Sequence, residues 1–170
     1  MRDAEFDPTL ILEALVRNGV DFVLIGGLAG TALGSAYVTY DVDVAYERSQ
    51  QNLERLAKAL VELGATLRGA PAGLPFQLDA ETLRAGMNFT FDTRFGSLDI
   101  LGEPAGAPRY EELREAGSSE TAWGLTIRIA SLDHLIAMKD AAGRPHDKVV
   151  AAELRTISDL QRAPKVDKPA

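Results

Sequence analysis

Residues 22–46 have the sequence FVLIGGLAGTALGSAYVTYDVDVAY, and this stretch decides the predicted fold. Its first four residues are all apolar, which predicts a short strand, and Gly26-Gly27 ends that strand. The segment LAGTAL at residues 28–33 then predicts a short helix. At residues 41–46 aspartates alternate with apolar residues, the period of two that is typical of a strand with two different faces. The stretch therefore predicts a strand, a glycine turn, a helix and a second strand.

Capping residues mark the other predicted helices. Asp7-Pro8 begins a helix that ends at Gly19, because aspartate caps free amides and proline fits the first helical position. Serines begin amphipathic runs at residues 49–64 and 131–143, and each run ends in glycine. Asp147 is expected to begin a last helix.

Three further strands are predicted at residues 87–93, 97–101 and 125–130, the first two as a tight hairpin. The order α-β-α-β-α-β-β-β-α-α predicts an α/β (α+β) sandwich with a mixed sheet, and we expect the helices to cover one face or end of it. With 170 residues, the chain is expected to form a single domain over residues 1–161. Residues 162–170 contain two prolines and mixed charges, and are expected to be a disordered tail.

Composition limits the chemistry. The chain has no cysteine and two histidines, so it cannot build a disulfide framework, a thiolate zinc site or a cysteine nucleophile. A bound metal would sit mainly on oxygen ligands, which favours Mg²⁺ or Mn²⁺. The formal net charge of −7 argues against broad, sequence-independent nucleic-acid binding.

The sequence also lacks the signals of a membrane or secreted protein. No apolar run approaches the roughly 18 residues that span a bilayer. The amino terminus, MRDAEFDP, is acidic where a secretory signal carries a basic stretch and an apolar one. A soluble, cytoplasmic protein is expected.

Three aspartates carry the predicted chemistry. Asp41 and Asp43 are two residues apart in one strand, so their side chains project from the same face. Asp99 lies between apolar residues in the second strand of the predicted hairpin. Three carboxylates on neighbouring strands can hold two metal ions about 3.5–4 Å apart, one activating a hydroxyl and one orienting a triphosphate.

The glycine pair supplies a site for phosphate. Gly26 and Gly27 have no β-carbon, so their backbone can approach a phosphate closely, and the amides that open the following helix point at the anion. Thr31 or Ser35 can add a hydroxyl contact. Thirteen residues, 28–40, separate Gly27 from Asp41, enough for one short helix and a return to the sheet.

These segments together resemble the nucleotidyltransferase superfamily, which has an apolar-Gly-Gly motif, a spacer, Asp-x-Asp and a later single Asp. In isolation a glycine pair is usually a turn and strand aspartates often face solvent, but their joint occurrence in this order indicates the site. Within the superfamily, the sequence is most similar to the minimal nucleotidyltransferases of the AbiEii type, many of which are toxins of toxin–antitoxin pairs. The resemblance implies a nucleotidyltransferase-like mixed sheet packed with helices, and metal ligands at Asp41, Asp43 and Asp99.

A second motif extends the resemblance. Residues 131–139, SLDHLIAMK, and 143–147, GRPHD, are similar to the C-terminal motif of these enzymes. The resemblance implies that Lys139 contacts the nucleotide triphosphate and that Asp147 supports it, while Arg144 and Thr39 are candidate nucleotide contacts. Structurally, Lys139 can equally be an amphipathic residue at a helix edge and Asp147 a helix cap.

The sequence departs from the family pattern at two positions. Tyr37 stands where family members often carry an arginine, which puts a basic phosphate or substrate contact in doubt. Val150 stands where a second aspartate often follows, so the support for Lys139 rests on Asp147.

The resemblance implies transfer of a nucleoside monophosphate from an NTP to an acceptor hydroxyl, with release of pyrophosphate. For the toxin type, the acceptor is the 3′ end of a tRNA, and a cognate antitoxin protein restrains the activity. Arg144, Lys148 and Arg155 are candidates for a local tRNA-binding patch. Two alternatives stay open: an enzyme that modifies a small molecule such as an aminoglycoside, or a protein, and a non-catalytic module that binds a nucleotide or partner.

Overall fold

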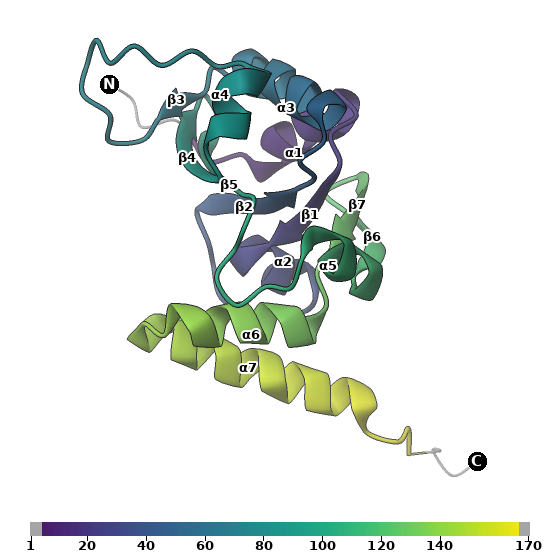
Figure 1. The fold of residues 1–170 in the computed structure, drawn as a ribbon. Coiled ribbons are helices and arrows are strands. Elements are labelled where there is room, and N and C mark those ends of the chain that lie inside the picture. Colours follow the sequence, from purple (N-terminus) through teal and green to yellow (C-terminus); the bar gives the residue numbers. More distant parts are fainter. Residues whose placement is uncertain (1–4, 167–170) are drawn as a thin grey trace.

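The computed structural model describes residues 5–166, which form an α/β fold around one seven-stranded mixed sheet (Figure 1). The strand order across the sheet is β3-β4-β5-β2-β1-β7-β6. The strands are β1 (Phe22–Ile25), β2 (Asp41–Tyr46), β3 (Thr66–Leu67), β4 (Asn88–Thr93), β5 (Gly96–Leu101), β6 (Ser118–Ala122) and β7 (Leu125–Ile129). The predicted fold class is confirmed.

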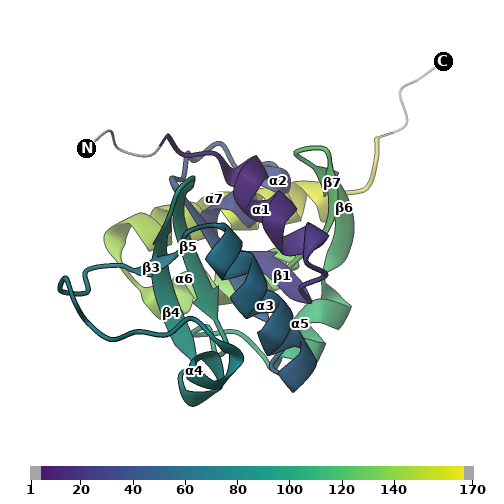
Figure 2. The same cartoon turned by 90° about the horizontal axis from the view of Figure 1, so that it is seen from above.

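Helices cover both faces of the sheet. They are α1 (Pro8–Arg17), α2 (Gly26–Ala32), α3 (Gln50–Glu62), α4 (Ala80–Ala85), α5 (Tyr110–Ala116), α6 (Leu132–Ala142) and α7 (Pro145–Arg162). α1 and α3 pack on one face, whereas α2, α6 and α7 lie on the other, as Figures 1 and 2 show. The expectation that helices cover one face or end of the sheet was therefore wrong. The apolar stripes of the amphipathic helices need more sheet surface than one face offers.

The register at the centre of the sheet brings the chemistry-bearing strands together. β2 pairs antiparallel with β1 and parallel with β5, so that Asp43 lies directly opposite Asp99. β4 and β5 form the predicted antiparallel hairpin, closed by the pair Thr93 and Gly96. On the other side of β2, Val42 and Val44 are fully buried in the core. The alternation predicted for this strand is thus confirmed.

The predicted helix caps are confirmed. The side chain of Asp7 accepts hydrogen bonds from two amides of the first turn of α1. Ser49 caps α3 and Ser131 caps α6, each accepting from the amide three residues later. Gly143 ends α6 in the left-handed region, with a φ of +66° that favours glycine.

Two helix starts and the tail boundary differ from the predictions. α2 begins at Gly26 rather than after the glycine pair, so the two glycines are its first residues. α7 begins at Pro145 rather than Asp147, because proline fits the first helical position and Asp147 closes the capping box. Arg162, predicted to open the tail, is the last residue of α7 and forms an ion pair with Asp133. Residues 167–170 of the predicted tail lie outside the described residues.

Four elements were not predicted: β3, α4, α5 and β6. Each is short or weakly patterned. β3 and β6 are the two edge strands of the sheet, and α4 and α5 are helices of six and seven residues. β6, for example, is the polar edge strand SSETA, which pairs antiparallel with β7.

Among residues 5–166, no helix combines the length and apolar character needed to cross a membrane.

Candidate active site

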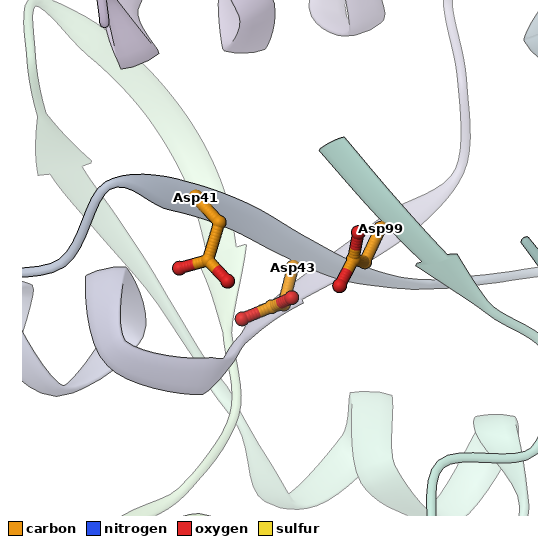
Figure 3. A group of neighbouring side chains, drawn as sticks. All are labelled: Asp41, Asp43 and Asp99. Atoms are coloured by element: carbon orange, nitrogen blue, oxygen red, sulfur yellow. The ribbon is translucent and has the colours of Figure 1, made fainter. Parts of the chain in front are cut away.

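Three carboxylates meet on the sheet face that α2 covers (Figure 3). Asp41 and Asp43 project from the same side of β2, and Asp99 projects from β5 beside them. One oxygen of each carboxylate lies within 4.8 Å of the other two. All three side chains are partly exposed, so the group is reachable from solvent. The structure therefore brings together the three residues that the sequence singled out.

The charge of this group is poorly compensated. Burial, followed by the negative charges of Asp41 and Asp99, raises the pKa of Asp43 to about 8. The positive charge of Lys139 opposes this shift. Burial also raises the pKa of Asp99, an effect that the neighbouring Arg68 opposes. At neutral pH the ion-free group thus holds a proton on Asp43.

This donor set fits a hard divalent cation. Mg²⁺ and Mn²⁺ prefer carboxylate oxygens, and closely spaced carboxylates of raised pKa are stabilised when a cation replaces the shared proton. Asp41, Asp43 and Asp99 are the residues that would hold it. The metal-binding role of the three residues stays a prediction.

Gly26 lies against the side chain of Asp43, and Gly27 lies against the side chain of Thr39. A β-carbon at Gly26 would lie 2.1 Å from Oδ2 of Asp43, and the φ of Gly26 is +71°. A β-carbon at Gly27 would lie 2.9 Å from the β-carbon of Thr39. Both positions therefore require glycine for packing. This close approach is an additional reason for the motif, beside the predicted phosphate contact.

The two threonines predicted to contact the nucleotide make hydrogen bonds within the protein. Thr39 donates from Oγ1 to Oδ1 of Asp41 over 2.5 Å, so it orients a carboxylate of the group. Thr31 donates to the carbonyls of Gly27 at 3.1 Å and Tyr37 at 3.3 Å, linking α2 to the loop that precedes β2. Ser35, the alternative to Thr31, accepts from the amide of Tyr37.

Lys139, Arg144 and Asp147 form a second charged cluster between α6 and α7. Asp147 is buried, and its two oxygens separately accept from Lys139 Nζ at 3.3 Å and Arg144 Nε at 2.7 Å. The hydrogen bond from Arg144 lowers the pKa of Asp147. Asp147 therefore stays ionised and holds both cations. Asp147 thus contacts the lysine that it was predicted to support, and the roles of both residues toward a triphosphate stay predictions.

The two departures from the family pattern have clear places in the structure. The ring of Tyr37 packs edge-on against His146, with the centroids 5.6 Å apart. Val150 is buried in the core on α7, 4% exposed. An apolar residue suits that position, because a buried carboxylate would need its own partner.

Arg68 is the residue at the site that the sequence did not indicate. It follows β3, and its Nη2 donates to Oδ1 of Asp99 over 2.9 Å. No motif in the sequence marks it, because β3 has only two residues and the contact depends on the pairing of β3 with β4. An arginine beside a weak strand would have been the only signal.

Comparison with known proteins identifies the fold. No protein-family model matches the sequence, and no curated protein matches it. Among solved structures, the lincosamide antibiotic adenylyltransferase LnuA in its lincomycin-bound form matches with a TM-score of 0.61 and 15% identity, over 91% of this chain and 99% of that chain.

Two further structures match in the same way. The antibiotic-resistance factor ANT(2'')-Ia has a TM-score of 0.52 and 16% identity, over 90% of this chain and 88% of that one. A candidate nucleotidyltransferase from Thermotoga maritima, TM1012, has a TM-score of 0.53 and 14% identity, over 89% of each chain. Identities this low establish a shared fold and not a shared activity. The chain therefore has the fold of these nucleotidyltransferase structures, with Asp41, Asp43 and Asp99 on neighbouring strands of its central sheet.

Proposed function

We propose that this protein is a metal-dependent nucleotidyltransferase that moves a nucleoside monophosphate from an NTP to an acceptor hydroxyl and releases pyrophosphate. The observation that carries the proposal is the in-register group Asp41, Asp43 and Asp99, with one oxygen of each within 4.8 Å of the others. Its position beside a glycine pair, in a fold shared with adenylyltransferases, supports the same conclusion.

Asp41 and Asp43 would hold both ions, and Asp99 would hold the ion on the acceptor side. When bound, Mg²⁺ or Mn²⁺ would activate the acceptor hydroxyl and neutralise the charge that develops on the triphosphate. Asp43 must lose its proton to act as a ligand, because its pKa of about 8 leaves it protonated at neutral pH. Thr39 fixes the orientation of Asp41 through its hydrogen bond.

The nucleotide would lie between the glycine pair and the cluster on α6 and α7. The backbone of Gly26 and Gly27 would approach a phosphate closely, as residues without a β-carbon allow. Lys139 would contact the triphosphate, because it is partly exposed and its charge acts on Asp43. Arg144 is 76% exposed, so it is free to contact a phosphate from its place on Asp147.

Transfer of labelled NMP tests the proposal. The protein is incubated with α-labelled NTPs, Mg²⁺ and a mixture of acceptors, and pyrophosphate release is followed in parallel. Asp41→Ala should abolish both signals and leave the melting temperature nearly unchanged, because a partly exposed site carboxylate contributes little to stability. Asp133→Ala, which removes an exposed aspartate that pairs with Arg162 and does not belong to the group, is the matched control. Transfer that survives Asp41→Ala would refute the assignment.

The resemblance to AbiEii-type toxins makes the 3′ end of a tRNA one candidate acceptor, with a cognate antitoxin as partner and a cytoplasmic location. The surface charges give this acceptor limited support. Arg155 forms an ion pair with Asp140, so one of the three residues of the predicted tRNA patch is neutralised. Polyanion binding depends on unneutralised cations.

A small hydroxylated molecule is the second candidate acceptor. The lincosamide adenylyltransferase supports it, because that enzyme of similar extent, matched over 99% of its chain, was solved with lincomycin bound. Incubation with labelled NTPs and either total tRNA or a panel of lincosamides and aminoglycosides separates the two. Label that enters RNA would favour the toxin reading, and label that enters only a small molecule would exclude it.

A module that binds nucleotide without transferring it is the remaining alternative. Calorimetry with Mg²⁺ and each NTP tests this case. Nucleotide binding that is unchanged in Asp41→Ala and Asp43→Ala, with no transfer to any acceptor, would replace the enzymatic proposal.

A further inference from the structure

Arg68 makes three side-chain contacts on the sheet face that carries the three aspartates. Its Nη2 donates to Oδ1 of Asp99 at 2.9 Å and to the carbonyl of Phe91 at 2.9 Å, and its Nε donates to Oδ1 of Asp92 at 3.1 Å. Its backbone amide donates to the carbonyl of Thr90. Fixed at this many points, the guanidinium is held in one place although its side chain is 35% exposed.

The sheet register explains why Arg68 meets Asp99. Asp43 lies opposite Asp99 across β2 and β5, and Asp99 lies opposite Thr90 across β5 and β4. Arg68 follows in the same row, bonded through its amide to Thr90. The row thus runs across three strands, β2, β5 and β4, to an arginine that follows β3, and Asp99 lies between the predicted metal ligand Asp43 and Arg68.

The hydrogen bond from Arg68 occupies Oδ1 of Asp99 and thereby sets the orientation of Oδ2. A carboxylate on a short side chain turns about two bonds, so a hydrogen bond to Oδ1 selects where Oδ2 points. Metal-ligating carboxylates are commonly oriented in this way by a second hydrogen-bonding group, and loss of that group lowers metal affinity or activity about 10- to 100-fold.

We propose that Arg68 is a positioning residue that orients Asp99 for the ion on the acceptor side. This inference rests on the proposed function. Arg68 acts through Asp99, so its loss should affect the ion that Asp99 holds and the transfer step, and should affect NTP binding much less. The proposed NTP contacts include Asp41 and Asp43, which lie on β2, on the side of β5 away from β4 and Arg68.

Mn²⁺ binding followed by electron paramagnetic resonance tests the inference without requiring activity. The full chain is titrated with Mn²⁺ in the presence of a non-hydrolysable NTP analogue. Arg68→Ala should lower the affinity for the second of two Mn²⁺ ions about 10- to 100-fold and leave the affinity for the first nearly unchanged. Arg94→Ala is the matched control, because Arg94 lies on the turn of the β4–β5 hairpin and bonds a carbonyl of Glu62 away from the aspartates.

Steady-state kinetics supply the second readout. In Arg68→Ala, kcat should fall about 10- to 100-fold while the KM for NTP changes less than about threefold. Added guanidinium at low millimolar concentration should restore part of kcat in Arg68→Ala and none in Asp99→Ala, which a merely structural effect would not produce. Arg68→Gln serves as a second variant if thermal melts show that Arg68→Ala is unfolded.

The outcomes separate this inference from the proposed function. Wild-type Mn²⁺ affinity and wild-type kcat in both Arg68 variants would overturn the inference, as would an equal loss in Arg94→Ala. A selective loss of Mn²⁺ affinity in Arg68→Ala, together with no NMP transfer by the wild-type protein, would uphold the role of Arg68 and overturn the enzymatic proposal.

Discussion

Asp43→Asn should make the ion-free protein more stable at neutral pH. The folded chain holds the Asp43 proton with a pKa of about 8, whereas the ordinary value is 3.8. Between these values the folded state binds more protons than the unfolded state, so the stability of the wild-type protein falls as the pH rises through that window. Asparagine keeps the shape of the side chain and carries no charge, so the variant lacks this contribution.

The size of the effect follows from the pKa shift. Between these two pKa values the free energy of unfolding falls by at most about 1.4 kcal/mol for each pH unit. A rise from pH 5.5 to 7.5 would therefore lower it by at most about 2.7 kcal/mol. Because Asp43 is only partly buried, solvent screens its charge, and we take half of this limit, about 1.3 kcal/mol, as the expected loss in the free energy of unfolding. For a chain of this size, that difference corresponds to about 3–5 °C in Tm.

Thermal melts in EDTA at pH 5.5 and 7.5 measure the effect. From the lower to the higher pH, the wild-type Tm should fall by about 3–5 °C more than the Tm of Asp43→Asn. Asp133→Asn, on an exposed aspartate, should follow the wild type. At pH 7.5, Mg²⁺ should raise the wild-type Tm and leave that of Asp43→Asn nearly unchanged. Equal pH dependence in the wild type and Asp43→Asn would refute the charge repulsion inferred for this group.

Two further substitutions test the surroundings of the site. Gly26→Ala should abolish Mn²⁺ binding and transfer, because the new β-carbon would lie 2.1 Å from Oδ2 of Asp43 at a φ of +71°; wild-type Mn²⁺ affinity in calorimetry would contradict this. Asp147→Asn should lower the free energy of unfolding by about 1–2 kcal/mol in urea at pH 7, because Lys139 and Arg144 lose a charged partner. The hydrogen bond from Arg144 lowers the pKa of Asp147. The wild-type protein should therefore have its full excess in free energy of unfolding over Asp147→Asn above about pH 4, and this excess should disappear as the pH falls below it. An excess that persists in acid would count against the ion pairs.

The central strands could be predicted because their patterns are strong. The alternation of Asp41, Val42 and Asp43 fixes which face each side chain takes, and the structure has the two valines of β2 in the core. Asp99 was placed by the predicted hairpin, and the pairing of β5 with β2 then sets it opposite Asp43. The order of strands in the sheet could not be read from the sequence, because pairing between distant segments leaves no local pattern.

The elements that the sequence did not predict, such as α4 and β6, have weak sequence patterns because they are short or lack the usual turn residues. Asp79 caps α4 by accepting from the amide of Thr82, as Asp7 does in α1, but α4 has only six residues and one fully buried side chain, Leu83. β6 and β7 meet at the two-residue turn Trp123-Gly124, where both residues have positive φ. A tryptophan at such a turn is unusual, so the hairpin lacked the asparagine or aspartate signal that marks most turns of this kind.

This division between strong and weak patterns also separates what can be inferred about the reaction from what can be inferred about the acceptor. The predicted metal ligands lie on β2 and β5, where the apolar alternation in the sequence indicates the face that each aspartate takes, and the pairing of β5 with β2 brings them together. If Asp99 holds the acceptor-side ion, as proposed, an acceptor would approach from the side of Asp99, where β3 and β4 form an edge of the sheet and Arg68 contacts both Asp92 and Asp99. Substitutions on β3 and β4 should therefore change acceptor preference, whereas substitutions on β2 should remove transfer to every acceptor.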